Sequence, residues 1–297
     1  MRLKDSFHPY AATTIVFWSL AYVMTKLALQ HFSTFALGFL RYLIASAILL
    51  VFMAINRMKL PKKADLPWFL AAGAIGFFVY MIAFNMGQAQ VTAATGSVVI
   101  ATAPMITALL AWAVYRESLR PIQWAAILLE FVGVLVMTLM TGVFSINSGL
   151  FWMLLAALSL SVYNLLQRRL TRTYTAMQTS TYGIFAGTLL LAVFARGSFQ
   201  EVASAPPVQL VYLGVLSVGS SAVGYVAWAK AFSKAEKTSQ VSNYMFATPF
   251  LSSLMGFLLA GEVPDRATLV GGGIILLGVF LFNFGELAWR SLTDRKG

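Results

Sequence analysis

The sequence lacks cysteine altogether and has only two histidines among its 297 residues. Without cysteine the chain can form neither a disulfide nor a thiolate metal site. It also lacks an H-E-x-x-H metal motif, a nucleotide-binding loop, and two carboxylates inside its apolar runs that could act as a dyad. These absences argue against a membrane-embedded hydrolase and against an ATP-driven pump. We therefore expect no enzyme activity, no metal and no cofactor.

Charge is scarce too: 10% of the residues are charged and 59% are hydrophobic, whereas a soluble domain is roughly 45–50% apolar. Apolar runs of near-spanning length recur ten times, and continuous runs favour helices over alternating strands. We expect an all-α integral membrane protein with ten transmembrane helices. The expected helices lie at 10–30, 34–54, 66–87, 92–114, 122–140, 149–167, 175–194, 208–229, 239–260 and 267–287. The first run is longer than a signal-peptide core and no A-x-A cleavage site follows it, so we expect it to be retained.

The basic residues predict the orientation of these helices. If the N-terminus is cytoplasmic, 17 of the 21 lysines and arginines fall in cytoplasmic segments, as the positive-inside rule requires. Both termini are then cytoplasmic. The net charge of +11 lies along the membrane face and gives no evidence for nucleic-acid binding. The expected partners are membrane lipid and a small-molecule substrate, and the sequence leaves a monomer and a homodimer open.

The stretch IATAPMITALLAWAVYRE at 100–117 returns as MFATPFLSSLMGFLLAGE at 245–262, at an offset of 145 residues. The same offset pairs Tyr80 with Tyr225, Pro104 with Pro249, Glu117 with Glu262, and Gly133 with Gly278. We interpret this as an internal duplication, with repeats at 10–140 and 149–287. Because each half has five expected spans, an odd number, the second half should enter the membrane inverted. Inverted repeats are typical of alternating-access transporters.

These features resemble the EamA repeats of the drug/metabolite transporter superfamily. The resemblance rests on the alanine- or threonine-proline of each fourth helix, the glutamate at its end, the glycine of each fifth helix, and the segments FWSLAYVMTKLAL at 17–29 and FLRYLIASAILL at 39–50. It implies an exporter in a bacterial inner membrane, lined mainly by the first, third, fourth, sixth, eighth and ninth helices. Members of the family export aromatic and other amino acids, sugars or drugs. We expect export of small metabolites, with apolar and aromatic amino acids favoured. The alternatives are a multidrug, nucleoside or sugar exporter, and a passive facilitator.

Polar and aromatic groups on the inner faces of the lining helices are the candidate substrate residues, because rings accept an apolar body while amides and hydroxyls orient a polar head. The candidates are Trp18, Tyr22, Tyr80, Tyr163, Asn164, Tyr225, Trp228, Gln240, Asn243 and Tyr244. The alternative is that they are interfacial aromatics or helix-to-helix contacts. Pro104 and Pro249 are candidate hinges, since proline removes a helical hydrogen bond, although proline is also common in membrane helices.

Charges inside apolar runs are costly and therefore informative. Lys26 is expected to extend to the membrane interface. For Arg41 we favour a structural role over substrate contact, and for Glu130 a polar helix or dimer contact over proton coupling. Glu117 and Glu262 are expected to bind loop amides or basic neighbours rather than substrate.

Overall fold

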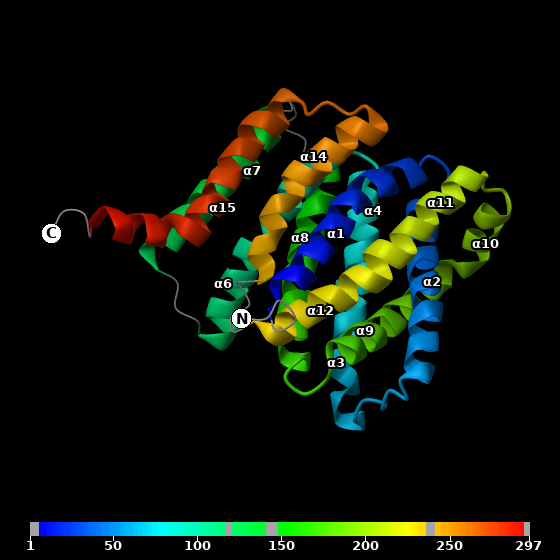
Figure 1. The fold of residues 1–297 in the computed structure, drawn as a ribbon. Coiled ribbons are helices and arrows are strands. Elements are labelled where there is room, and N and C mark those ends of the chain that lie inside the picture. The colour runs from blue at the N-terminus through cyan, green and yellow to red at the C-terminus, as the bar shows by residue number, and fades with distance from the viewer. Residues whose placement is uncertain (1–5, 117–119, 141–147, 236–240, 294–297) are drawn as a thin grey trace.

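The computed structural model describes residues 6–116, 120–140, 148–235 and 241–293. All regular structure in these ranges is helical (Figure 1). The α-helices are α1 (His8–Ala28), α2 (Thr34–Ile55), α3 (Leu66–Gly73), α4 (Tyr80–Gln88), α5 (Ala93–Ile100), α6 (Ala103–Tyr115), α7 (Pro121–Met140), α8 (Ser148–Leu170), α9 (Ala176–Leu191), α10 (Ala195–Ala203), α11 (Pro207–Val215), α12 (Gly224–Lys234), α14 (Ala247–Ala260) and α15 (Arg266–Thr293). The π segments are η3 (Ala74–Val79) and η5 (Leu216–Val223), and the 3₁₀ segments are η2 (Lys63–Asp65), η4 (Ala192–Phe194) and η6 (Asn243–Phe246).

Seven helical segments of the described chain are long and apolar enough to cross a membrane. They are His8–Ala28, Thr34–Ile55, Lys63–Gln88, Ala93–Tyr115, Ser148–Leu170, Ala176–Ala203 and Pro207–Lys234. Shorter apolar helices follow at Pro121–Gly133, Ala247–Ala260 and Arg266–Phe282. The prediction of an all-α, multi-pass membrane protein is confirmed, whereas the count of ten spans stays a prediction.

The middle of the bundle is built on aromatic rings. Phe77 of η3 is fully buried, and its ring centroid lies 5.3, 5.1 and 4.8 Å from those of Tyr42, Tyr163 and Tyr225. Glycine makes this packing possible: a Cβ at Gly76 would lie 2.2 Å from the Tyr163 ring. Helices α2, η3, α8 and α12 therefore converge on one aromatic cluster, next to which the candidate site lies.

Both prolines of the repeated stretch follow an interruption in a helix. Helix α5 ends at Ile100, and Pro104 lies in the first turn of α6. In the second half, Pro249 lies in the first turn of α14, directly after the 3₁₀ segment η6. The missing N–H of proline costs least in a first turn. The interruptions occupy corresponding places in both halves, and a hinge there stays a prediction.

The third helix of each half also contains a π segment. Shifting η3 by the repeat offset gives 219–224, which overlaps η5. π segments are rare and are frequently found at functional sites. Each of the two segments runs directly into a helix, α4 or α12, whose first turn carries a tyrosine, Tyr80 or Tyr225.

Helices α7 and α15 pack side by side at one edge of the bundle (Figure 1). Their contact is reciprocal. A Cβ added to Gly133 would lie 2.7 Å from a side-chain atom of Ile275, and one added to Gly278 would lie 2.6 Å from the Glu130 side chain. The offset of 145 converts one contact into the other, so the two helices meet about an internal pseudo-two-fold relation.

Candidate functional site

A cavity of about 20 Å³ lies between the two halves. It is lined by Trp18, Ala21 and Tyr22 of α1, Arg41 of α2, Tyr80 and Phe84 of α4, Ile100 of α5, Leu160 of α8, Tyr225 of α12, Met245 of η6 and Thr248 of α14. That volume holds about one water molecule. Ligand sites for small molecules measure roughly 300–1,000 Å³, so the walls must move apart to admit a metabolite.

Aromatic rings form most of the cavity wall. Trp18 and Tyr22 lie one helical turn apart on α1, and the ring of Trp18 lies 5.1 Å from that of Tyr225. The ring of Phe84 lies 5.2 Å from Tyr22 and 5.7 Å from Tyr80. Such surfaces hold apolar groups and attract organic cations through the ring faces. Four predicted substrate residues, Trp18, Tyr22, Tyr80 and Tyr225, are thus brought together, and their contact with substrate stays a prediction.

Two polar side chains of the wall are only 3% exposed, Arg41 and Thr248. The Nη1 of Arg41 donates to the Thr25 hydroxyl at 3.4 Å and to the Met81 sulfur at 3.7 Å. The Arg41 Nε and the Thr248 hydroxyl have no hydrogen-bond partner among the described residues. Arg41 therefore lies on the cavity with most of its donors unused, a position that sequence reasoning missed because it assigned this residue a structural role.

Three other predicted residues are packed beside the cavity rather than lining it. The Trp228 indole donates to Asn164 Oδ1 at 3.2 Å, and the Asn164 amide donates to the Thr107 hydroxyl at 3.3 Å. The Tyr163 hydroxyl accepts from Gln167 at 2.6 Å. Trp228, Tyr163 and Asn164 are all fully buried. Their hydrogen bonds join α6, α8 and α12. In this conformation the three side chains have no exposed surface that a substrate could contact.

The remaining predicted residues belong to the ninth expected helix. Tyr244 contacts His8 through its hydroxyl and Phe7 through its ring, and it does not line the cavity. Gln240 and the side chain of Asn243 lie outside the described residues, as does Glu117. Thr248, the second residue of α14, lines the cavity wall where we expected this group.

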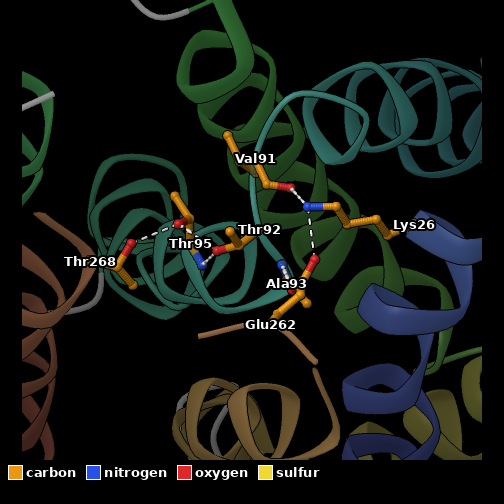
Figure 2. Close-up of polar contacts among 7 residues, drawn as sticks. All are labelled: Lys26, Val91, Thr92, Ala93, Thr95, Glu262 and Thr268. Atoms are coloured by element: carbon orange, nitrogen blue, oxygen red, sulfur yellow. Dashed lines mark hydrogen bonds and ion pairs between the residues drawn. The ribbon is translucent and has the colours of Figure 1, made fainter. Parts of the chain in front are cut away.

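An ion pair joins α1 to the residues that follow α14 (Figure 2). Lys26 Nζ lies 2.8 Å from Glu262 Oε1 and donates to the Val91 carbonyl at 3.1 Å. Glu262 Oε2 accepts the Ala93 N–H at the start of α5, at 2.9 Å, where the helix dipole favours a negative charge. Gly261, at a φ of +64°, ends α14 and directs Glu262 toward this position. Glu262 thus binds a backbone amide and a basic neighbour, and it holds α1, α5 and α14 together.

A larger hollow of about 780 Å³ lies on the flank of the bundle, between α1, α2, α9, η5 and α12. Its lining is mostly aliphatic and aromatic, with Thr13, Thr175 and Lys230 among its polar side chains. It does not lie between converging polar groups, and Val218 and Val223 on its wall are exposed. We therefore interpret it as a groove toward the lipid, and the central cavity as the candidate site.

A multi-pass helical bundle with an aromatic cavity between its two halves is an architecture that many membrane transport proteins share. The chain belongs to the EamA-like transporter family, whose model matches it twice, at residues 8–139 and 147–284.

Curated relatives are transporters as well. The Bacillus subtilis transporter YdfC is 31% identical over 266 residues, covering 88% of this chain and 86% of that protein. A probable terminal-alkyne amino-acid exporter of Streptantibioticus cattleyicolor is 29% identical over 287 residues, covering 96% and 95%. An S-adenosylmethionine uptake transporter of Rickettsia bellii is 23% identical over 265 residues, covering 89% and 88%. These names place the chain among transporters rather than enzymes and differ in substrate and direction.

A solved crystal structure also shares the fold. Its chain is 17% identical, superposes with a TM-score of 0.60, and matches over 92% of this chain and 97% of its own length. At this identity the likeness concerns the fold alone.

Proposed function

We propose that this protein is an alternating-access secondary transporter that exports small metabolites from the cytoplasm, and that its substrates are amino acids with apolar or aromatic side chains. The observation that carries the proposal is the central cavity. Its wall draws on both halves of the chain and combines aromatic rings with a few polar groups. Rings suit the apolar body of such a solute, and the polar groups suit its charged head.

The proposal includes ten transmembrane helices in two inverted repeats of five. The double family match supports two repeats, and so do the reciprocal contacts of Gly133 and Gly278 across α7 and α15. The three shorter apolar helices complete the ten when added to the seven long segments. The distribution of lysine and arginine supports cytoplasmic termini in a bacterial inner membrane.

Export of amino acids is favoured by the relative from Streptantibioticus cattleyicolor, which is matched over nearly its whole length. The uptake transporter from Rickettsia bellii is more distant, and its cargo, S-adenosylmethionine, is itself an amino acid. A passive facilitator of the same fold is the nearest rival, and it differs from a carrier in kinetics rather than in architecture.

Counterflow in proteoliposomes tests the proposal. Vesicles are loaded with unlabelled amino acid, diluted into labelled phenylalanine, leucine, threonine or lysine, and compared with empty liposomes. A carrier accumulates label transiently above equilibrium, with phenylalanine and leucine ahead of lysine. A facilitator that works as an open pore equilibrates the label without this overshoot.

The matched variants are Tyr80→Ala on the cavity wall and Tyr212→Ala on α11, outside the cavity. We expect Tyr80→Ala to lower counterflow while Tyr212→Ala leaves it near the wild-type rate, at equal membrane abundance. If folded protein accumulates none of the four labelled amino acids, the assignment to apolar and aromatic amino acids is wrong, and S-adenosylmethionine, nucleosides, sugars and cationic drugs form the next panel.

A further inference from the structure

The strongest unexplained group in the described chain is the Arg41 guanidinium. It is 3% exposed, lies within the membrane-spanning helix α2, and lines the central cavity. A guanidinium always carries a positive charge and has five N–H donors. Leaving such a charge buried without a counter-ion is costly. Its position therefore requires a partner that the described residues do not supply.

The described carboxylates are engaged elsewhere or lie far from α2. Asp65 accepts from Tyr174, Glu201 from Ser33, and Asp265 from the Thr268 N–H at the start of α15. Glu262 pairs with Lys26. Glu130 is buried between α7 and α15, at the edge of the bundle. None of these described carboxylates forms an ion pair with Arg41.

The bonds that Arg41 does make use one nitrogen. Both run from Nη1, and both are long, at 3.4 Å to the Thr25 oxygen and 3.7 Å to the Met81 sulfur. Nε and Nη2 donate to none of the described residues. These two nitrogens form the side edge of the guanidinium, which presents two parallel N–H groups. That edge matches the two oxygens of a carboxylate.

The neighbours of Arg41 on the wall suit the rest of an amino acid. Tyr22, Tyr80 and Tyr225 present rings to the same cavity, and ring faces attract an ammonium group or cover an apolar side chain. Thr248, whose hydroxyl has no partner in the described chain, adds a hydrogen-bonding group from the second half.

We infer that Arg41 is the carboxylate-binding residue of the central cavity, and that the transported solute carries a carboxylate. This inference rests on the proposed function and deepens it: it selects zwitterionic and acidic metabolites over cationic drugs and uncharged sugars. Arg41 holds the carboxylate by its Nε–Nη2 edge, while the tyrosine rings enclose the rest of the solute.

A pair of solutes that differ only at the carboxyl tests the inference. Phenylalanine and phenylalaninamide share the ring and the amine, but the amide has no negative charge. Counterflow of both is measured for the wild type, for Arg41→Gln and Arg41→Lys, and for Arg196→Gln, which makes the same change at an exposed position. Membrane abundance and unfolding temperature are measured for each variant.

We expect the wild type to prefer phenylalanine over phenylalaninamide by about tenfold or more, the scale of a lost charge-assisted hydrogen-bond pair. Arg41→Gln abolishes this preference by lowering phenylalanine counterflow, and Arg196→Gln keeps it. Arg41→Lys retains part of it, because an ammonium keeps the charge without the two-pronged geometry. If Arg41→Gln is poorly folded, the inference is tested by Arg41→Lys, which should lose part of the preference for phenylalanine.

An unchanged preference in folded Arg41→Gln or Arg41→Lys overturns the inference and leaves the proposed function standing. If the wild type carries no amino acid, the proposed function fails. The inference about Arg41 is then tested by ligand binding alone. In that case the unfolding temperature in detergent is measured against 3-phenylpropionate and 3-phenylpropionamide. Stabilisation of the wild type by the carboxylate alone, absent in Arg41→Gln, supports the inference, and equal or no stabilisation contradicts it.

Discussion

Both halves of the chain line the central cavity; they contribute corresponding aromatic and apolar residues but different polar residues. Tyr80 and Ile100 line it from the first half, and their counterparts Tyr225 and Met245, each 145 residues later, line it from the second. The polar groups are not duplicated. Thr248 corresponds to Ala103, and the second-half helix α9, the counterpart of α2, has no basic residue to match Arg41.

We interpret the aromatic residues that both halves share as serving the conformational change, and the polar residues that only one half has as serving substrate recognition. In the proposed mechanism, the similar aromatic surfaces of the two halves, each of which follows a π segment, allow either half to open or close against a solute at comparable cost. In the same proposal, the single cationic group Arg41 sets the orientation of the solute. Four predictions follow from the comparison, in order of expected effect.

The largest effect is expected where the halves meet most closely. A methyl group at Gly133 or Gly278 would come within 3.0 Å of backbone atoms of the facing helix, so Gly133→Ala and Gly278→Ala should each destabilise the fold by about 1–3 kcal/mol, as overpacking does. Gly273→Ala on α15 meets nothing within 4 Å and should leave stability unchanged or slightly raised. Thermal unfolding in detergent measures all three. Equal unfolding temperatures for the three variants would contradict the reciprocal contact.

The second prediction separates the paired tyrosines. The Tyr225 hydroxyl lies 3.4 Å from that of Tyr42, whereas the Tyr80 hydroxyl makes no hydrogen bond within the described ranges. Tyr225→Phe should therefore cost up to about 1 kcal/mol of stability, and Tyr80→Phe none. We expect Tyr80→Phe to lower transport, because its hydroxyl is available to a solute. Unfolding temperature and counterflow are measured for both variants. A larger loss of counterflow in Tyr225→Phe than in Tyr80→Phe would show that the Tyr80 hydroxyl does not contact the solute.

The third prediction concerns the contact between Lys26 and Glu262, which joins the first half to the end of α14. Lys26 is about one-third exposed, at 34%, and Glu262 is 14% exposed, so the ion pair itself contributes at most about 1 kcal/mol. Glu262→Ala should cost more than Lys26→Ala, because it also removes the acceptor of the Ala93 N–H. A double-mutant cycle gives the coupling of the pair. A larger loss of stability for Lys26→Ala than for Glu262→Ala would mean that the hydrogen bond from the Ala93 N–H to Glu262 contributes little.

The smallest effect is expected at Glu130, where the second half has Ile275. Both Glu130 oxygens are buried without a hydrogen-bond partner in the described chain. Glu130→Ile makes the halves alike and should leave stability unchanged or raised, since replacing an unsatisfied buried carboxyl removes its desolvation cost. Glu130→Gln should leave transport and its pH dependence unchanged. A pH profile that flattens in Glu130→Gln would instead assign this residue to proton coupling.

The sequence predicts the helical membrane fold because composition and run length carry that information directly. Tyr80 and Tyr225, which the shared offset pairs, both line the central cavity, and their contact with substrate stays a prediction. Other features depend on contacts between distant helices. Nothing near Trp228 in the chain reveals that its indole donates to Asn164. Contact of these two residues with substrate stays a prediction.

Arg41, by contrast, was expected to have a structural role, and the structure places it on the cavity wall. The sequence singled it out as a charge within an apolar run, and a structural role was the reasonable reading, because most such charges pair with protein groups. The structure shows that Asp65, Glu130, Glu201, Glu262 and Asp265 all lie away from Arg41 or bind other groups, so Arg41 has no counter-ion among these described carboxylates.

The central claim is that the two halves open alternately around one cavity, and distances between spin labels test it directly. The chain has no cysteine, so introduced pairs report without background. Gln30 with Val263 spans the end of the bundle where Lys26 and Glu262 pair, and Ala113 with Lys230 spans the end where α6 and α12 terminate. On adding phenylalanine, the account predicts that the population with a long distance at one end rises as that at the other end falls. Long distances at both ends together, or no change at either, would contradict it.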